Sequence, residues 1–497
     1  MFLRGVTQKF TSIFGPASRA LAIVLTLMAP AAVGQTKVKS VPFAYVPDQS
    51  ADPYAERLPN KLLPLPDGTF LLLTRRSAQE YAVERYANAD LKQRWACVVP
   101  LAAGEGIDAF ATSADAAVLL TYRADATTGE QTMTGIRIDL ASGQRTEPKV
   151  LLTAGKGRRL NGSVSDDGTK VVVYETRTRQ SQLTELQTVV LDNRFKELTR
   201  TLVDLRGAGG SASATVRVSN GGDQYVGLQT DGGIKLTVRR YPLKGDEAQV
   251  LGVPVGGVFG GQKVYIFDTA YRFDQDGALY AAAVCMNEES GEYYSLKVVK
   301  FDFQANDIRY AEEIRFDKAY LAELAASAKA AGATAPDRLA DTYLSDVLLT
   351  PEKQVVVLLE RKEEEGETAP HFAKEMLLFG YNEFGRPAWH SALWKNQQAP
   401  AKEGYSGIGY RARVQGTTLH VVTLETKGKV QDLFDHPYSA LTGKPQPARP
   451  LGLNVAPGQP VNHVKDFTTW LDAKTLLAVS RPAKNTTTLT LNKIVLK

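Results

Sequence analysis

A polar turn followed by a short apolar strand recurs along this chain and limits the folds that it can adopt. In the clearest copy, the turn at residues 163–170 leads into three β-branched valines at residues 171–173, followed by Tyr174. Gly takes positive φ at little cost and Asp or Ser hydrogen-bonds to nearby backbone, so such a stretch favours a chain reversal. Eight copies are found, and their turns begin at Pro66, Ser113, Ser163, Ser219, Asp274, Thr350, Gln415 and Asp472. The chain is therefore expected to be an all-β repeat protein.

Further strands follow each of these turns. Apolar and polar residues alternate at residues 136–140 and 296–301, which is typical of a strand with one buried face. We predict four antiparallel strands in each unit, joined by hairpins. The units begin about 48 to 76 residues apart. A repeat of roughly 40 to 50 residues with four strands matches one blade of a β-propeller.

The chain ends are expected to close the ring. A single four-stranded blade cannot bury both of its faces, whereas a ring of blades can. The last unit ends at residues 488–496 without an outermost strand, and residues 39–46 near the N-terminus form a lone strand candidate. We predict an eight-bladed β-propeller in which this N-terminal strand completes the last blade. Units one and eight are the least regular, so a seven-bladed ring is the alternative.

One segment departs from the strand pattern. At residues 317–341, apolar side chains recur at helical spacing among alanines, namely Tyr320, Leu321, Leu324, Ala325 and Ala328. We predict a short helical insertion that ends near Gly332. It either covers a blade edge or forms a lid over the mouth of the ring.

Residues 1–34 have the pattern of a secretory signal peptide. Basic residues precede an apolar run and a pair of small residues, namely Arg4, Lys9 and Arg19, residues 20–32, and Ala32 and Gly34. The alternative is an uncleaved anchor, but the apolar run is shorter than the roughly 20 residues that span a bilayer. Residues 35–497 are then a single exported β-propeller domain, in the periplasm, secreted or at the cell surface. No later segment is long and apolar enough to span a membrane.

Charge and cysteine content exclude some classes of protein. The chain has 59 basic and 54 acidic residues, and 56 basic residues remain without the signal peptide. This near-equal number of basic and acidic residues argues against a nucleic-acid-binding surface, which needs clustered Lys and Arg. Cys97 and Cys285 lie in apolar runs of different units, so we expect two buried thiols rather than a disulfide.

The turn at residues 164–174, from Ser165 through the Asp167-Gly168 pair into an apolar strand, resembles the repeat of TolB-like β-propellers. The turns at Asp67-Gly68 and Asp276-Gly277 match it in part, and most other units lack the Asp-Gly pair. The resemblance implies a propeller and implies no functional residues.

No motif predicts a catalytic residue, a metal ligand or a cofactor site. Residues 404–408 nearly fit a nucleophile elbow, but Ile408 replaces the last Gly. Asp274 and Asp276 offer too few oxygens for calcium. The five histidines, which are His371, His390, His420, His436 and His463, lack metal-binding spacing. The acidic run at residues 363–365 is expected in a solvated loop.

The long loops concentrate around the sixth unit. Residues 317–341 lead into that unit, residues 361–372 form its middle loop, and residues 394–405 leave it. Loops on a rigid scaffold carry binding residues, so we predict that His371, Trp394 and Tyr405 contact a ligand there. Packing between blades is the other interpretation of each aromatic ring.

Two functions are compatible with these observations. The first is a non-enzymatic exported propeller that binds a protein, peptide or glycan at the ring mouth. The second is a propeller enzyme that acts on polysaccharide through carboxylates lining the channel, because paired carboxylates from different blades leave no linear motif. The missing motifs favour the first.

Overall fold

A computed structural model describes residues 36–46, 58, 60–206, 213–245, 247–310, 312–364, 366, 369–401, 404–427, 430–453, 463–481 and 487–496. Residues 35–497 form one compact unit. The predicted signal peptide, residues 1–34, lies outside the described residues.

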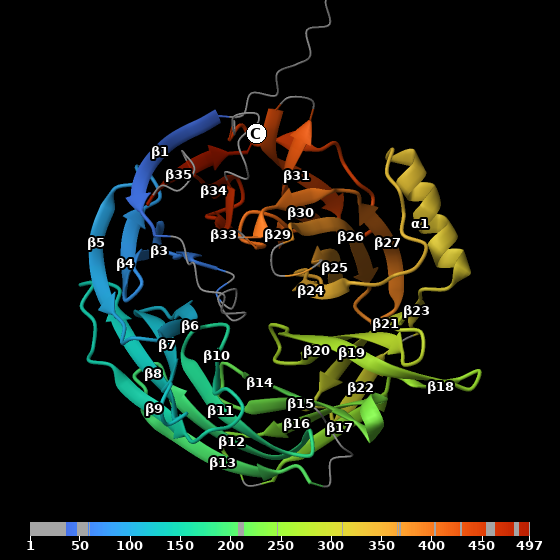
Figure 1. The fold of residues 1–497 in the computed structure, drawn as a ribbon, viewed down its shortest axis with the longest axis horizontal. Helices are drawn as coiled ribbons and strands as arrows, with labels where there is room; N and C mark the ends of the chain where they lie inside the picture. The colour runs from blue at the N-terminus through green and yellow to red at the C-terminus, as the bar shows by residue number, and fades with distance from the viewer. Residues whose placement is uncertain are drawn as a thin grey trace, which may run out of the picture. The chain divides into compact units, whose positions relative to one another are not determined.

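Eight antiparallel sheets follow one another around a ring, and we number them as blades in chain order (Figure 1). Blade 1 contains β2 (Leu62–Pro64), β3 (Thr69–Ser77), β4 (Glu80–Ala87) and β5 (Gln93–Pro100). Blade 2 contains β6 (Glu105–Thr112), β7 (Ala116–Ala124), β8 (Gln131–Asp139) and β9 (Lys149–Ala154). Blade 3 contains β10 (Asn161–Val164), β11 (Lys170–Arg179), β12 (Gln182–Asp192) and β13 (Glu197–Asp204). Blade 4 contains β14 (Ala214–Val218), β15 (Gln224–Thr230), β16 (Lys235–Tyr241) and β17 (Gln249–Pro254).

The second half of the ring carries extra strands. Blade 5 contains β18 (Gly257–Phe259), β19 (Gln262–Phe273), β20 (Leu279–Asn287), β21 (Tyr293–Asp302), β22 (Asp307–Tyr310) and β23 (Ile314–Arg315). Blade 6 contains β24 (Thr342–Leu349), β25 (Val355–Glu364), β26 (His371–Tyr381), β27 (Pro387–Leu393) and β28 (Gln397–Ala399). Blade 7 contains β29 (Tyr410–Gln415), β30 (Thr418–Lys427), β31 (Val430–Ser439) and β32 (Arg449–Pro450). Blade 8 contains β33 (His463–Trp470), β34 (Thr475–Ser480), β35 (Thr488–Val495) and β1 (Thr36–Ala44).

The eight-bladed prediction is confirmed, and the seven-bladed alternative is wrong. Each predicted turn lies between the first and second strands of its blade, except in blade 5, where β18 comes first and the turn joins β19 to β20. In blade 3, Asp167 Oδ1 accepts hydrogen bonds from Ser165 Oγ at 2.6 Å and from the Thr169 N–H at 3.0 Å. Gly168 has φ +69°, and a Cβ there would lie 2.0 Å from the Thr112 carbonyl oxygen of blade 2. The Asp-Gly pair therefore shapes the turn and lets it pack against the neighbouring blade.

The predicted closure of the ring is also confirmed. Strand β1 pairs antiparallel with β35, with Phe43 opposite Leu489 and Val41 opposite Leu491. Phe43 is buried, and its ring centroid lies 5.5 Å from that of Phe467 in β33. The N-terminal strand therefore supplies the outermost strand of blade 8 and covers apolar side chains that would otherwise face water.

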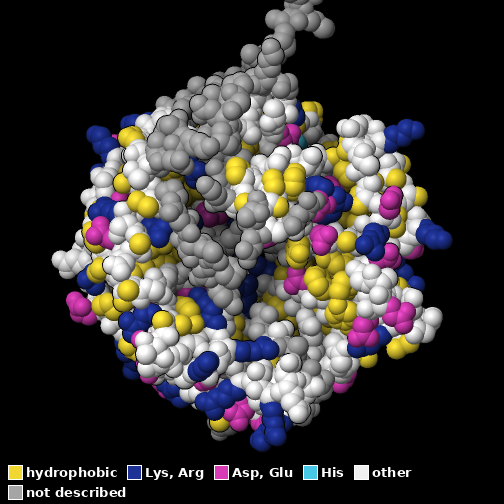
Figure 2. Space-filling model, in the orientation of Figure 1, with side chains coloured by type: hydrophobic (Ala, Val, Ile, Leu, Met, Phe, Trp, Pro, Cys, Tyr) yellow, Lys and Arg dark blue, Asp and Glu magenta, His cyan; other side chains and the backbone are white. Residues whose placement is uncertain are grey.

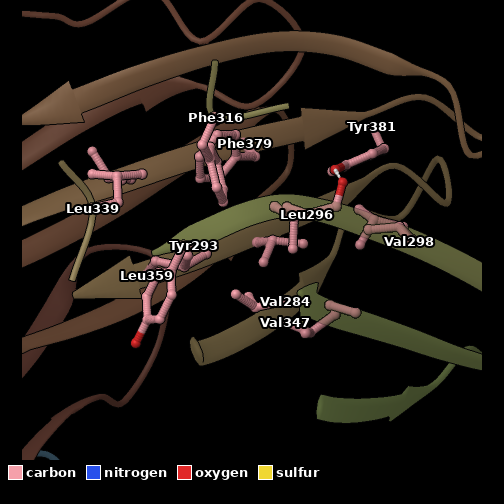
Figure 3. Packing of buried hydrophobic residues seen from close by; sticks show 14 of the residues in the cluster. Val284, Tyr293, Leu296, Val298, Phe316, Leu339, Val347, Leu359, Phe379 and Tyr381 are labelled. Atoms are coloured by element: carbon pink, nitrogen blue, oxygen red, sulfur yellow. Dashed lines mark hydrogen bonds between the residues drawn. The ribbon is translucent and has the colours of Figure 1, made fainter. Parts of the chain in front are cut away.

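Apolar side chains between neighbouring blades form the core. Between blades 5 and 6, Val284, Leu296 and Val298 lie in one cluster with Leu359 and Phe379 (Figure 3). The Tyr381 hydroxyl of blade 6 donates a hydrogen bond to the Leu296 carbonyl oxygen of blade 5 at 3.3 Å. Burial of the phenol raises the pKa of Tyr381, which keeps this donor protonated.

The predicted helical insertion is present as α1 (Lys318–Ala330). Asp317 caps its N-terminus by accepting hydrogen bonds from the backbone of Ala319 and Tyr320, and Gly332 follows its end at φ +69°. The Tyr320 ring stacks near Phe379 of β26, and Glu323 lies 3.0 Å from His390 of β27. The helix therefore covers the outer side of blade 6 (Figure 1), and the lid interpretation is wrong.

Both cysteines are free and buried, as predicted, in β5 and β20. Burial raises the pKa of Cys285 to about 12. Asp274 accepts hydrogen bonds from the Asp276 and Ala278 N–H groups, so this pair of carboxylates shapes a turn. Within the described residues, no helix has the length and apolar character needed to cross a membrane.

The pairing of β1 with β35 predicts that Phe43→Ala destabilises the protein by about 3–5 kcal/mol, because the truncation leaves a cavity beside Phe467. Lys39 lies exposed on the same strand, so Lys39→Ala should change the unfolding free energy by about 0.5 kcal/mol or less. Urea unfolding of both variants measures the difference. Equal stability of the two would contradict closure by this strand.

Candidate functional site

A pocket of about 670 Å³ lies at the predicted mouth, where blades 5, 6 and 7 meet. Aromatic and charged side chains dominate its lining, which consists of Asp268, Asp341, Tyr343, Leu344, Lys362, Glu363, Glu364 and Tyr405. These residues come from β19, the start of β24, the end of β25 and the segment before β29. The pocket thus lies among the long loops from which the mouth was predicted.

The end of the β25–β26 hairpin forms one wall of the pocket. Strand β24 begins at Thr342, opposite Arg361, whereas the pairing of β25 with β26 continues to Glu364 opposite His371. Strand β28 returns along the other side of β26, with Ala399 opposite His371. Glu363 and Glu364 therefore lie within a strand, so the expectation of a loop is wrong for them, although Glu364 is exposed to solvent. Glu365, the third residue of the predicted run, lies outside the described residues.

Two of the three predicted ligand-binding residues lie together. The His371 and Tyr405 rings meet at a centroid distance of 5.0 Å with an interplanar angle of 62°. The Tyr405 hydroxyl donates to the Glu363 carbonyl oxygen at 3.3 Å, and the Lys362 ammonium lies 4.8 Å from the Tyr405 ring centroid. Tyr405 lines the pocket, and His371 supports it from the side.

Trp394 lies elsewhere. Its indole N–H donates a hydrogen bond to Ser327 Oγ of α1 at 3.1 Å. Its ring packs against the cluster between blades 5 and 6 that includes Tyr320 and Phe379. The structure therefore places Trp394 against the helical insertion and does not bring it to Tyr405.

Two carboxyl groups of the pocket lining, Glu363 and Asp268, have pKa values shifted in opposite directions. Glu363 pairs with Arg361 at 2.6 Å and with Lys374. Burial opposes ionisation of Glu363, but these two cations outweigh it and lower the pKa of the carboxyl. Burial raises the pKa of Asp268, despite hydrogen bonds from the Thr269 and Leu344 backbone. The lining therefore combines a paired carboxylate with one that holds its proton more tightly than usual.

A buried ion pair lies behind the pocket. Lys395 Nζ lies 2.8 Å from Glu360 Oε1, and their side chains are 0% and 2% exposed. Lys395 also donates to Gln397 Oε1 at 2.9 Å, and Gln397 in turn accepts from the Gly409 N–H. Burial lowers the pKa of Lys395. This network ties the exit of blade 6 to the first strand of blade 7.

A buried histidine holds the segment that carries Tyr405. His463 Nε2 lies 2.7 Å from Thr468 Oγ1, and the ring also hydrogen-bonds to the backbone of Gly407. Lys465 N–H donates to the Ser406 carbonyl oxygen at 2.8 Å. Burial lowers the pKa of His463 to about 3, so the ring is neutral at physiological pH.

The sequence pattern missed most of the pocket. Asp268 and Tyr343 lie inside strands of two consecutive blades, far apart in sequence, and nothing local marks them as neighbours. Tyr343 is 42% exposed, which is unusual for a strand tyrosine but invisible in the sequence. Among the described residues, no group of three or more His, Cys, Asp or Glu side chains is placed to hold a metal ion.

Comparison with known proteins supports no particular activity. No protein-family model and no curated protein matches the sequence. The β-propeller domain of the Trilobed protease from Pyrococcus furiosus is 10% identical, with 80% of this chain and 97% of that domain covered at a TM-score of 0.36. Polysaccharide lyase Uly1 is 11% identical, with 78% and 90% covered at 0.39. A protein from Lactobacillus plantarum is 13% identical, with 80% and 97% covered at 0.39.

We predict that Lys395 and Glu360, the buried ion pair, are strongly coupled in their contributions to the unfolding free energy. Lys395→Met and Glu360→Leu should each cost about 3–5 kcal/mol, since each leaves a buried charge without its partner. The double variant should cost less than the sum of the two, as a double-mutant cycle in urea will show. Additive costs would mean that the two side chains do not depend on each other.

Because His463 is buried and its pKa is lowered, we predict that the folded protein loses stability in acid. Because its folded-state pKa is below the unfolded value of 6.5, its contribution is complete above pH 6.5 and declines as pH falls towards about 3. The slope should reach about 1.4 kcal/mol for each pH unit. His463→Gln should remove this part of the pH dependence, whereas His390→Gln, at an exposed histidine of β27, should retain it. Identical pH profiles for wild type and His463→Gln would show that the ring is not buried as a neutral group.

Proposed function

We propose that the chain is an exported β-propeller that binds a protein, peptide or glycan at the ring mouth without turnover. The observation that carries this proposal is the pocket formed by Tyr343, Tyr405 and the end of the β25–β26 hairpin. Tyrosine offers a large, rigid contact surface with a polar tip, and such side chains are common where proteins hold ligands.

The support beneath Tyr405 favours binding at this place. The ring is fixed on one side by His371 and on another by Lys362, and its hydroxyl is held by the backbone of Glu363. A side chain held in this way loses little conformational freedom when a ligand covers it. The pocket is therefore prepared for contact before a ligand arrives.

Export is part of the same proposal and is supported by the composition of residues 1–34. The destination is the periplasm, the cell surface or the medium. The TolB-like character of the repeat is likewise an interpretation, supported by the Ser165–Asp167–Thr169 hydrogen bonds in the blade 3 turn.

A second function has one observation in its favour. Asp268 shares the pocket with Asp341 and Glu364, and burial raises the pKa of Asp268. A carboxyl with a raised pKa in the same pocket as Glu363, whose pKa is lowered, is the kind of pair that general acid catalysis on a polysaccharide uses. This enzyme function predicts turnover that Asp268→Asn abolishes while ligand binding persists.

A screen of the purified protein against glycan and peptide arrays tests the proposed binding. Tyr405→Ala should weaken the affinity for any ligand found by about tenfold or more, because an anchoring aromatic side chain is lost. Tyr310→Ala is the matched control, since Tyr310 is 49% exposed on β22 of blade 5, outside the pocket. Equal affinity of wild type and Tyr405→Ala would place the ligand elsewhere. Product formation from a bound glycan would favour the enzyme.

A further inference from the structure

Four cationic side chains gather at the inner ends of blades 6, 7 and 8, behind the mouth pocket. Lys362 and Lys395 come from blade 6 and its exit, Arg411 from β29 and Lys465 from β33. Four carboxyl groups of described residues lie among them. Asp346 lies near Arg411, and burial raises the pKa of that carboxyl; Glu375 lies near Lys395 and pairs with Arg361. The other two, Glu360 and Asp466, have ion-pair partners of their own. Glu360 pairs with Lys395 at 2.8 Å, and Asp466 pairs with Lys61 at 2.9 Å and with Arg411 at 3.3 Å.

Lys465 differs from the other three cations in its contacts. Its ammonium forms no hydrogen bond or ion pair with the part of the chain that the structure describes. Burial lowers the pKa of Lys465. Asp466 and Glu360 oppose that effect, and Lys362 and Arg411 add to it. A half-buried ammonium among other cations is unfavourable unless something negative compensates it.

Gly409 leaves open space beside this ammonium. It has φ +98°, and a Cβ at this position would lie 3.3 Å from Lys465 Nζ and 3.5 Å from each Glu360 carboxylate oxygen. No other residue type would adopt this backbone conformation readily or leave the gap unfilled. The lysine side chain and the ion pair thus face each other across a position without a side chain.

Lys362 connects this cluster to the mouth. It lines the pocket, its ammonium is held over the Tyr405 ring, and it lies 3.9 Å from Glu360 Oε2. Its side chain is 26% exposed, so it remains open to solvent. Figure 2 shows Lys and Arg side chains at the edge of the central hollow of the ring face.

We propose that Lys465 and Lys362 bind an oxyanion, either a carboxylate or a phosphate, at the inner end of the mouth pocket. Oxyanions accept the charge-assisted hydrogen bonds that two ammonium groups offer, and each bond is worth more away from bulk water. That this oxyanion belongs to a larger ligand rests on the proposed function. The anion site itself does not, because it can be tested with free anions.

Calorimetric titration of the purified protein with inorganic phosphate and with acetate, at constant ionic strength, tests the site. Wild type should bind at least one of the two saturably. Lys465→Met and Lys362→Met keep the length of the side chain and remove its charge, and each should weaken binding at least tenfold. Lys244→Met removes an exposed lysine of blade 4 and should leave the affinity unchanged.

The outcomes separate the possible ligands. Binding of phosphate alone points to a phosphate-bearing ligand, binding of acetate alone to a carboxylate-bearing one, and binding of both to a general oxyanion site. No saturable binding of either anion by wild type overturns the proposal, as does equal affinity in Lys362→Met, whose side chain is partly exposed to solvent. Saturable anion binding by wild type together with no ligand from the array screen would contradict the mouth function alone.

Discussion

The ring depends on backbone pairing between two strands at opposite ends of the chain. Seven blades take their strands from continuous stretches, whereas blade 8 takes its outermost strand, β1, from the N-terminal end of the domain. The Ser40–Asn492 hydrogen bond spans 452 positions of sequence. Closing so long a loop costs entropy that only a large buried surface offsets. That surface is the cluster of Phe43, Tyr45 and Phe467 with apolar residues of blades 1 and 8.

In the closed ring, an ion pair also joins blade 8 to blade 1. Lys61, just before β2, pairs with Asp466 of β33, and its N–H donates to the Asp466 carbonyl oxygen at 2.8 Å. Burial lowers the pKa of Lys61, but Asp466 and Tyr45 outweigh it and raise the pKa above the ordinary value. Because Asp466 also contacts Arg411, the same carboxylate links three successive blades. The pocket and the lysine cluster lie beside this link, so their geometry depends on a closed ring.

The sequence predicted what depends on local residues. Turns such as Ser165–Thr169 are built from side chains that hydrogen-bond within a few positions, so all eight were located. Helix α1 was visible in the spacing of Tyr320, Leu324 and Ala328, the three residues that it buries. The closing strand was predicted from a missing strand at the other end of the chain. The position of α1 outside the ring, and not over the mouth, was not predictable, because Tyr320 of the helix packs against Phe379 and His390, which lie in strands of blade 6 distant in sequence.

The site was predicted only in outline. Long loops around blade 6 indicated the mouth, and His371 and Tyr405 were brought together because β28 folds back along β26. Trp394 precedes that return and packs against α1 instead. Asp268, Tyr343 and Lys465 carry no local signal, because their neighbours come from other blades and are set by the ring. The acidic run was misread because Glu363 and Glu364 extend a strand that ion pairs stabilise.

Native-state hydrogen exchange of the backbone amides of β1 tests closure of the ring most directly. If β1 is an integral strand of blade 8, its amides should exchange with the same free energy of opening as those of β34 and β35, because the strands unfold together. Exchange of β1 at a much lower opening free energy, with β34 and β35 still protected, would show that the ring stays folded without its N-terminal strand.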